Sequence, residues 1–221
     1  MELIERYASW LSCPDCSRDL DPVDDRTLGC TSGHRFDLGR RGYIGLARSG
    51  QRIPSTRDPD PRRQRTAHPS PETPGVRAAA LAMLGRGQRI ADVHPGTGAL
   101  LAELLAGHPS RRVCALATSP QLLESVVTGT AAAGVLADTQ RTWPFRDGAA
   151  DVLLAIDAPL FPSEFHRVLS PGGTLIAAPR ESDMPTLVDD LYLWFEHDQS
   201  RPIGDGRIAL RLRRRRRMLT W

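Results

Sequence analysis

Four residues near the N-terminus have the types and spacing of metal ligands: Cys13, Cys16, Cys30 and His34. Each pair is closely spaced, so one turn of chain can present two ligands to the same ion. Thiolate and imidazole are ligands that suit a tetrahedral structural Zn²⁺. A segment of about thirty residues buries little core unaided, so a metal would supply much of its folding free energy. The sequence predicts a structural zinc site.

A disulfide with two bystander residues is the alternative interpretation of these positions. The N-terminus shows no basic stretch followed by an apolar run and a cleavage site, so it gives no indication of export to an oxidising compartment. We therefore favour zinc and expect a cytoplasmic protein. The remaining cysteine, Cys114, lies in an apolar run far downstream, and we expect it to be a buried small hydrophobe.

A second group of residues has the pattern of a cofactor-binding turn. Asp92 ends a short apolar run, and Gly96 and Gly98 follow before a helical pattern begins. Glycines in such a turn let the backbone pass close to a ligand without intervening side chains. An isolated Gly-x-Gly is weak as a signal, but its place between a strand and a helix strengthens the interpretation.

The elements that would position these residues alternate between strands and helices. We expect a helix over residues 2–11 and another over residues 76–84. Strands are expected over residues 89–93, 112–117, 135–136, 150–156, 174–178 and 207–212, and helices over residues 99–106, 121–128, 163–169 and 185–196. Such alternation predicts an α/β fold, a doubly wound Rossmann-like sheet covered by helices on both faces. Ligands of such sheets bind beyond the carboxyl ends of the strands.

The length of 221 residues allows one α/β domain plus a small module. We divide the chain into a zinc-binding module (1–47), a linker rich in proline and arginine (48–75) and the α/β domain (76–221). A turn at residues 170–173 is expected to separate the helix over 163–169 from the next strand. No apolar run approaches the roughly eighteen residues of a membrane span, so we expect no membrane partner.

The basic residues of this chain are unusual because all 29 of them are arginine, with lysine absent. A GC-rich genome explains this more simply than selection for guanidinium chemistry. Arginines gather at residues 62–65 and at residues 211 and 213–217. These clusters fit phosphate contacts in RNA, although a solvated tail explains the second one equally well.

The residues around His34 resemble one family. Residues 33–37 (Gly-His-Arg-Phe-Asp) and 40–46 (Arg-Arg-Gly-Tyr-Ile-Gly-Leu) are similar to the zinc-bearing ribosomal RNA guanine-N1-methyltransferases. In that family a Phe-Asp and a Gly-Tyr-hydrophobic-x-Leu segment follow the last zinc ligand. The resemblance implies a class I S-adenosylmethionine (SAM) domain, SAM as cofactor and ribosomal RNA as partner. It also implies a methyltransferase that could confer antibiotic self-resistance.

The resemblance extends to the cofactor-binding residues. Asp92 matches the family's acid at the end of the first strand, and Gly96 and Gly98 match its second and third glycines. His94 takes the place of the first glycine, where it could contact a ligand or fill space. Asp138 follows the third strand, at a position where SAM enzymes often contact the adenine.

Later segments match as well. Residues 164–173 carry the family's Glu-x-x-Arg-Val-hydrophobic-x-Pro-Gly-Gly signature, which builds a helix end and turn. Asp157 and Pro159 lie where the family has Tyr-Ala-Pro, and the resemblance places Pro159 beside the cofactor. Methylation of guanine N1 requires a proton to leave, and Asp157 could accept it as catalytic base. The alternative is that Asp157 caps a turn.

Three departures from the family pattern stand out. Ala117 replaces the acid that accepts both ribose hydroxyls of SAM. The stretch corresponding to the family's cofactor-closing linker has no methionine or tyrosine and many prolines. The chain also ends early for the family, so we expect a C-terminally shortened domain.

Three functions therefore stay open. The first is an rRNA methyltransferase. The second is a degenerate methyltransferase-fold protein that has lost SAM and binds RNA or a partner. The third is the same scaffold acting on a small secondary metabolite. A homodimer is compatible with each. His166 is expected to be structural, while Trp194 and Trp221 could stack on a base but more simply pack in a core or an interface.

Overall fold

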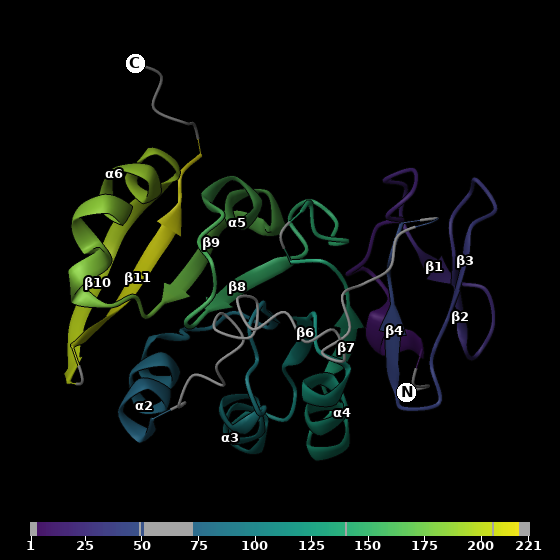
Figure 1. The fold of residues 1–221 in the computed structure, drawn as a ribbon, viewed down its shortest axis with the longest axis horizontal. Coiled ribbons are helices and arrows are strands. Elements are labelled where there is room, and N and C mark those ends of the chain that lie inside the picture. Colours follow the sequence, from purple (N-terminus) through teal and green to yellow (C-terminus); the bar gives the residue numbers. More distant parts are fainter. Residues whose placement is uncertain (1–3, 49, 51–72, 140, 205, 217–221) are drawn as a thin grey trace.

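The computed structural model describes residues 4–48, 50, 73–139, 141–204 and 206–216. An eight-stranded sheet runs through the molecule (Figure 1). Across the sheet its strands are β10 (Phe195–Gly204), β11 (Arg207–Arg214), β9 (Leu169–Ala177), β8 (Ala150–Ala155), β5 (Arg89–Asp92), β6 (Arg112–Ala117), β7 (Ala133–Leu136) and β4 (Tyr43–Gly45). The strands from β9 to β4 run parallel, and β11 is antiparallel to both β9 and β10.

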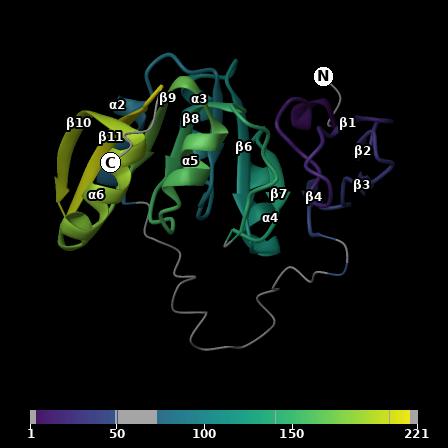
Figure 2. The ribbon, with the colours of Figure 1, turned by 90° about the horizontal axis from the view of Figure 1, so that it is seen from above.

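Helices cover both faces of this sheet (Figures 1 and 2). One face carries α2 (Pro74–Met83), α3 (Ala99–Gly107) and α4 (Pro120–Gly129), and the other carries α5 (Pro162–Val168) and α6 (Met184–Trp194). A short 3₁₀ helix, η2 (Glu181–Asp183), leads into α6. The predicted doubly wound α/β fold is confirmed. None of the described helices has the length and apolarity needed to cross a membrane.

Two helices begin with the same local device. The Thr73 hydroxyl accepts a hydrogen bond from the Val76 N–H at 3.3 Å, and the Ser119 hydroxyl accepts one from the Leu122 N–H at 3.4 Å. In both helices a proline occupies the first helical position, where its missing N–H costs nothing. These caps fix where α2 and α4 start, and α4 starts directly beyond the carboxyl end of β6.

Several sequence-based expectations need correction. The helix expected over residues 2–11 is only one 3₁₀ turn, η1 (Ile4–Tyr7), among the described residues. The turn expected at 170–173 lies inside β9, where a register shift interrupts the pairing with β8. The helix expected over 185–196 ends at Trp194, because Phe195 begins β10. The strand expected over 207–212 is present as β11, and it pairs with β10, a strand that the sequence did not predict.

The N-terminal segment forms a small antiparallel sheet of its own and also extends the large one. β1 (Asp21–Pro22), β2 (Thr27–Gly29) and β3 (Arg35–Asp37) pair in that order. β4 leaves this unit and pairs in parallel with β7. The proposed boundary at residue 47 therefore follows a strand that belongs to the main sheet. Most of the linker proposed over 48–75 lies outside the described residues.

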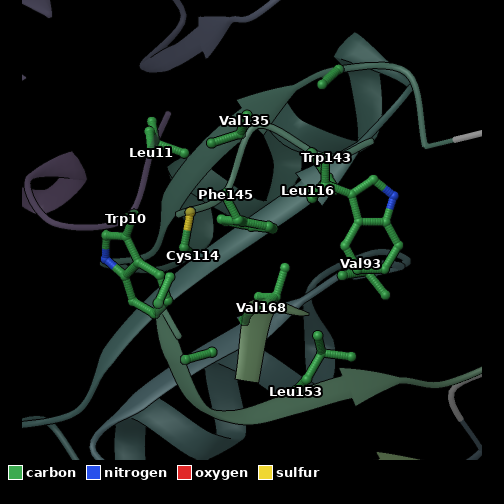
Figure 3. Packing of buried hydrophobic residues seen from close by; sticks show 14 of the residues in the cluster. Trp10, Leu11, Val93, Cys114, Leu116, Val135, Trp143, Phe145, Leu153 and Val168 are labelled. Atoms are coloured by element: carbon green, nitrogen blue, oxygen red, sulfur yellow. The ribbon is translucent and has the colours of Figure 1, made fainter. Parts of the chain in front are cut away.

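An aromatic contact joins the N-terminal segment to the main core. The rings of Trp10 and Phe145 lie 6.3 Å apart, and both side chains are almost fully buried. Figure 3 shows Phe145 among Trp10, Leu11 and the sheet residue Cys114. Because one continuous apolar cluster contains residues of both parts, the N-terminal unit is docked on the sheet rather than suspended from it.

Arg146 holds the N-terminal unit against the main domain by hydrogen bonds to backbone carbonyls. Its guanidinium donates to the carbonyl oxygens of Leu11 at 2.9 Å and Leu20 at 2.6 Å. It also pairs with Asp21 at 2.7 Å and with Asp19 at 3.2 Å. One side chain thus satisfies acceptors on both sides of the first pair of metal-ligand candidates.

We predict that Arg146→Ala lowers the free energy of unfolding by about 2–3 kcal/mol, because it strips two carbonyls of a charged donor. Chemical denaturation monitored by tryptophan fluorescence measures this. Arg41→Ala is the matched control, since Arg41 and Glu124 form an exposed ion pair whose loss costs about 1 kcal/mol or less. Equal effects of the two substitutions would contradict the role given to Arg146.

Candidate metal centre and cofactor site

The four predicted metal ligands converge on one point. All their ligand atoms lie within 4.8 Å of one another. The Nδ1 atom of His34 lies 3.4 Å from the sulfur atoms of both Cys13 and Cys30, and the sulfur atoms of Cys16 and Cys30 are 3.6 Å apart. A tetrahedral ion with Zn–S bonds of about 2.3 Å and Zn–N bonds of about 2.0 Å would separate its ligands by roughly 3.5–3.8 Å. The cluster fits Zn²⁺.

The disulfide alternative does not fit these distances. The sulfur–sulfur distance of 3.6 Å between Cys16 and Cys30 far exceeds the roughly 2.05 Å of a disulfide, and all four cysteines are free. Cys114 is fully buried on β6 and lies outside the cluster, as predicted. Burial raises the pKa of its thiol, so Cys114 stays a neutral, apolar side chain.

Two tight turns present the ligands. In the first, the Cys13 N–H donates to the Arg18 carbonyl at 2.7 Å and the Ser17 N–H to the Cys13 carbonyl at 2.8 Å. In the second, the Gly33 N–H donates to the Cys30 carbonyl at 3.0 Å. Gly33 has a φ of +90°, which favours glycine and lets this turn reverse within the spacing of Cys30 and His34. The hydrogen bond from the Arg18 N–H lowers the pKa of Cys16 to about 6, which favours the thiolate that a metal requires.

The predicted cofactor turn lies at the carboxyl end of β5. Asp92 is buried, and its Oδ1 atom accepts a hydrogen bond from the His94 N–H at 3.0 Å. Gly96 and Gly98 have φ values of +52° and +86°. A Cβ atom at Gly98 would lie only 3.0 Å from a methyl group of Val126 on α4. Glycine at position 98 is thus required both for the backbone conformation and for the packing of the turn against α4.

His94 fills the place of the missing glycine by bonding to the neighbouring strand. Its Nδ1 atom lies 3.1 Å from the carbonyl oxygen of Ile156, directly after β8, so this nitrogen carries the donated proton. The imidazole therefore spans the ends of β5 and β8. This contact ties the cofactor turn to the residue that precedes Asp157.

Asp157 is held by a cation that the sequence did not suggest. Arg207, the first residue of β11, donates to the Oδ1 atom of Asp157, and its side chain is only 5% exposed. The Oδ2 atom of Asp157 is buried and lacks a hydrogen-bond partner among the described residues. Asp157 also has a φ of +52°, which Asp tolerates better than most residues. Pro159 follows two residues later and is exposed.

The carboxyl ends of β6 and β7 differ in the side chains that they offer a ligand. Ala117 ends β6 with its methyl group buried, so no carboxylate is present there. Asp138 follows β7 and is half-buried, and Arg141 pairs with it at 3.4 Å. Asp138 lines a cavity of about 510 Å³. The other walls of this cavity include residues 46–48 and residues 12–14, which belong to the turn that carries Cys13 and Cys16 and is called the metal loop below. The structure thus gathers Asp92, His94 and Asp157 at one place and sets Asp138 beside the metal-bearing unit.

The Glu-x-x-Arg signature is structural. Glu164 accepts from the Trp143 N–H at 3.0 Å and pairs with Arg167 at 2.8 Å. Arg167 also donates to the Phe145 carbonyl at 2.6 Å, so the pair fixes the loop that carries Arg146. This agrees with the prediction that the signature reports the fold rather than the chemistry.

The C-terminal arginines have mixed roles. Arg214 donates to the Leu169 carbonyl at 2.5 Å, and Arg215 donates to the carbonyls of Tyr192 and Phe195 at 3.1 Å. These two join β11 to the ends of α5 and α6. His166 packs on Trp194 with ring centroids 5.2 Å apart, and the half-buried Trp194 lies against the main apolar cluster. Trp221 and the arginines at 62–65 lie outside the described residues.

Comparisons with known proteins identify the family. Residues 91–177 match a family described as "Methyltransferase domain". The chain is 34% identical over 211 residues to the 23S rRNA (guanine(748)-N(1))-methyltransferase of Streptomyces fradiae, which covers 92% of this chain and 74% of that protein. It is 30% identical over 222 residues to a Micromonospora griseorubida protein provisionally named a 23S rRNA (guanine-N(1)-)-methyltransferase, covering 90% and 74% of the two chains.

A solved structure supports the fold independently. The N-methyltransferase NodS of Bradyrhizobium japonicum, in complex with S-adenosyl-L-homocysteine, matches with a TM-score of 0.52 and 13% identity, over 65% of this chain and 89% of that one. At this identity the likeness concerns the fold alone. The sequence relatives carry the assignment: the chain belongs to the 23S rRNA (guanine-N1)-methyltransferase family of SAM-dependent methyltransferases.

Proposed function

We propose that this protein transfers the methyl group of SAM to N1 of a guanine in 23S rRNA, in the cytoplasm where ribosomes are assembled. The observation that carries the proposal is the 34% identity to the Streptomyces fradiae enzyme over 92% of the chain. The arrangement of Asp92, Gly96 and Gly98 at the carboxyl end of β5 supports it, because parallel sheets bind their ligands at this edge.

SAM supplies a sulfonium methyl group, so the S–CH₃ bond breaks as the N1–CH₃ bond forms, leaving S-adenosylhomocysteine. The protein's task is mainly to position the reactants. Asp92 and the turn with Gly96 and Gly98 would hold the amino-acid portion of SAM. Asp138 would contact its adenine, with Pro159 beside the cofactor.

The proton on guanine N1 also has to leave, and Asp157 is the candidate acceptor. It follows β8 directly beside the residue that His94 bonds, within the same edge as the cofactor turn. Arg207 engages Oδ1, which leaves Oδ2 as the acceptor without a donor. An unsatisfied buried acceptor is costly, and the N–H of a bound base would satisfy it. We therefore assign Asp157 the role of general base and Arg207 the role of holding it.

Zn²⁺ would be structural in this protein. Cys13, Cys16, Cys30 and His34 supply all four ligands of a tetrahedral site, so no coordination position is left for a substrate. The metal would fix residues 12–14, which wall the cavity beside Asp138.

Titration calorimetry with SAM, followed by methyl transfer to 23S rRNA, tests the proposed function. Reverse transcription should stop at the modified guanine, because a methyl group on N1 blocks base pairing. Absence of SAM binding at millimolar concentration would exclude the activity. SAM binding with no modification of rRNA would exclude the substrate.

The missing ribose acid gives a gain-of-function prediction. Ala117→Asp should tighten SAM binding by about 2–3 kcal/mol, a factor of tens to about a hundred, because a carboxylate there can accept both ribose hydroxyls. Ala117→Asn is the control with similar shape and no charge, and should gain much less. Calorimetry measures both. If neither substitution changes the affinity, the ribose does not lie at the end of β6.

The proposed base gives a second prediction. Asp157→Asn should lower kcat by about a hundredfold or more, with the SAM dissociation constant nearly unchanged, because the amide cannot take up the proton. Single-turnover methyl transfer measures this. The control is Asp147→Asn, which removes an exposed carboxylate paired with Arg167. An Asp157→Asn enzyme with wild-type kcat would assign Asp157 to turn formation.

The proposed zinc site gives a third prediction. The purified protein should contain one equivalent of zinc by atomic absorption, and a strong chelator should lower its thermal midpoint, because metal binding and folding are coupled. Cys30→Ser should lose the metal, whereas Cys114→Ala should keep it. Retention of zinc by Cys30→Ser would contradict the ligand assignment.

A further inference from the structure

Arginines gather at the amino edge of the sheet, opposite the proposed active site. Arg211 and Arg213 lie near the end of antiparallel β11, where Arg213 pairs with Thr174. Together with Arg214, Arg216 and Glu196, these residues line an open groove of about 760 Å³. We call this surface the amino-edge groove.

Arg111 lies beside Arg211, because both guanidinium groups approach Gly85. Its Nη2 atom donates to the Gly85 carbonyl at 2.6 Å. A Cβ atom at Gly85 would lie 3.0 Å from the Nη2 atom of Arg211, so the two guanidinium groups meet at this glycine. The Nη1 atom of Arg111 is buried and has no acceptor among the described residues.

The charge of this region is large for its size. Residues 211–216 contain five arginines and no acidic residue, and with Glu196 and Asp198 of the paired strand their formal charge is +3, as large as that of the whole chain. Arg211 and Arg213 share one carboxylate, that of Asp198, at 3.2 and 3.3 Å. Arg216 is exposed and has no ion-pair partner among the described residues. The local acids therefore leave a net positive surface.

We propose that the amino-edge groove binds phosphates of the RNA substrate, as a second contact remote from the reacting guanine. This rests on the proposed function, because it concerns the same substrate. Guanidinium groups bind phosphate oxygens in bidentate fashion. Among the described residues no aromatic side chain lines the groove, and its guanidinium groups are suited to phosphates of the RNA backbone rather than to base edges.

The geometry sets how long the RNA must be. The two edges of the sheet are separated by the six residues of β6, which span about 20 Å at 3.3 Å per residue. An RNA duplex rises less per base pair than the roughly 3.4 Å of B-form DNA, so it needs more than about six base pairs to cover that distance directly, and more still to pass around the surface. Only RNA that extends well beyond the target guanine can occupy both contacts.

The test compares two double variants of the full-length protein in RNA binding. Arg213→Gln/Arg216→Gln removes two arginines of the groove. Arg41→Gln/Arg77→Gln is the matched control, since each of these arginines pairs with a helix glutamate elsewhere on the surface. Affinity for an extended 23S rRNA fragment is measured as a function of salt. The groove variant should reduce the slope of log K against log salt by about 1.5 and weaken binding roughly 10- to 50-fold at 0.1 M salt.

A short RNA that carries only the target guanine and its immediate neighbours provides the second arm. Its affinity should be equal for the wild type and the groove variant, because it cannot reach the groove. An unchanged salt slope on the extended RNA, an equal loss in the control variant, or an equal loss on the short RNA would overturn the proposal. SAM affinity and methylation by the wild type test the proposed function separately.

Discussion

Parallel pairing of β5 with strands on both sides is the constraint from which the rest of the site follows. β5 pairs with β6 on one side and with β8 on the other, so successive strand ends face the same edge. Asp92, Ala117, Asp138 and Asp157 each lie at the end of a different strand of this set. Their distances along the chain therefore become short distances across the sheet.

The sequence predicts this arrangement wherever a local pattern specifies it. The metal ligands come from two tight turns, so their spacing alone predicted the cluster that the structure shows. The apolar runs of the central strands predicted the sheet, because strands buried on both faces read as continuous apolar segments. β10 was missed because residues 196–202 are all exposed, and only pairing with β11 makes them a strand.

Contacts across long sequence separations could not be predicted. Arg207 meets Asp157 although fifty residues separate them, and no local motif marks either as the other's partner. Arg146 and Arg167 resemble ordinary surface cations in the sequence, yet both donate to backbone carbonyls of distant segments. A run of arginines therefore predicts positive charge but not what each side chain binds. Arg215 donates to carbonyls of α6 and β10, while the neighbouring Arg216 is exposed.

The docking of the N-terminal unit links the metal to the chemistry. Arg146 binds the carbonyl of Leu11, two residues before the ligand Cys13. The same metal loop walls the cavity that Asp138 lines. A metal that orders this loop would therefore also order one wall of the region where the adenine is proposed to lie. Because Ala117 offers the ribose no carboxylate, cofactor affinity has to come from the remaining contacts, and the rigidity of that wall then bears directly on it.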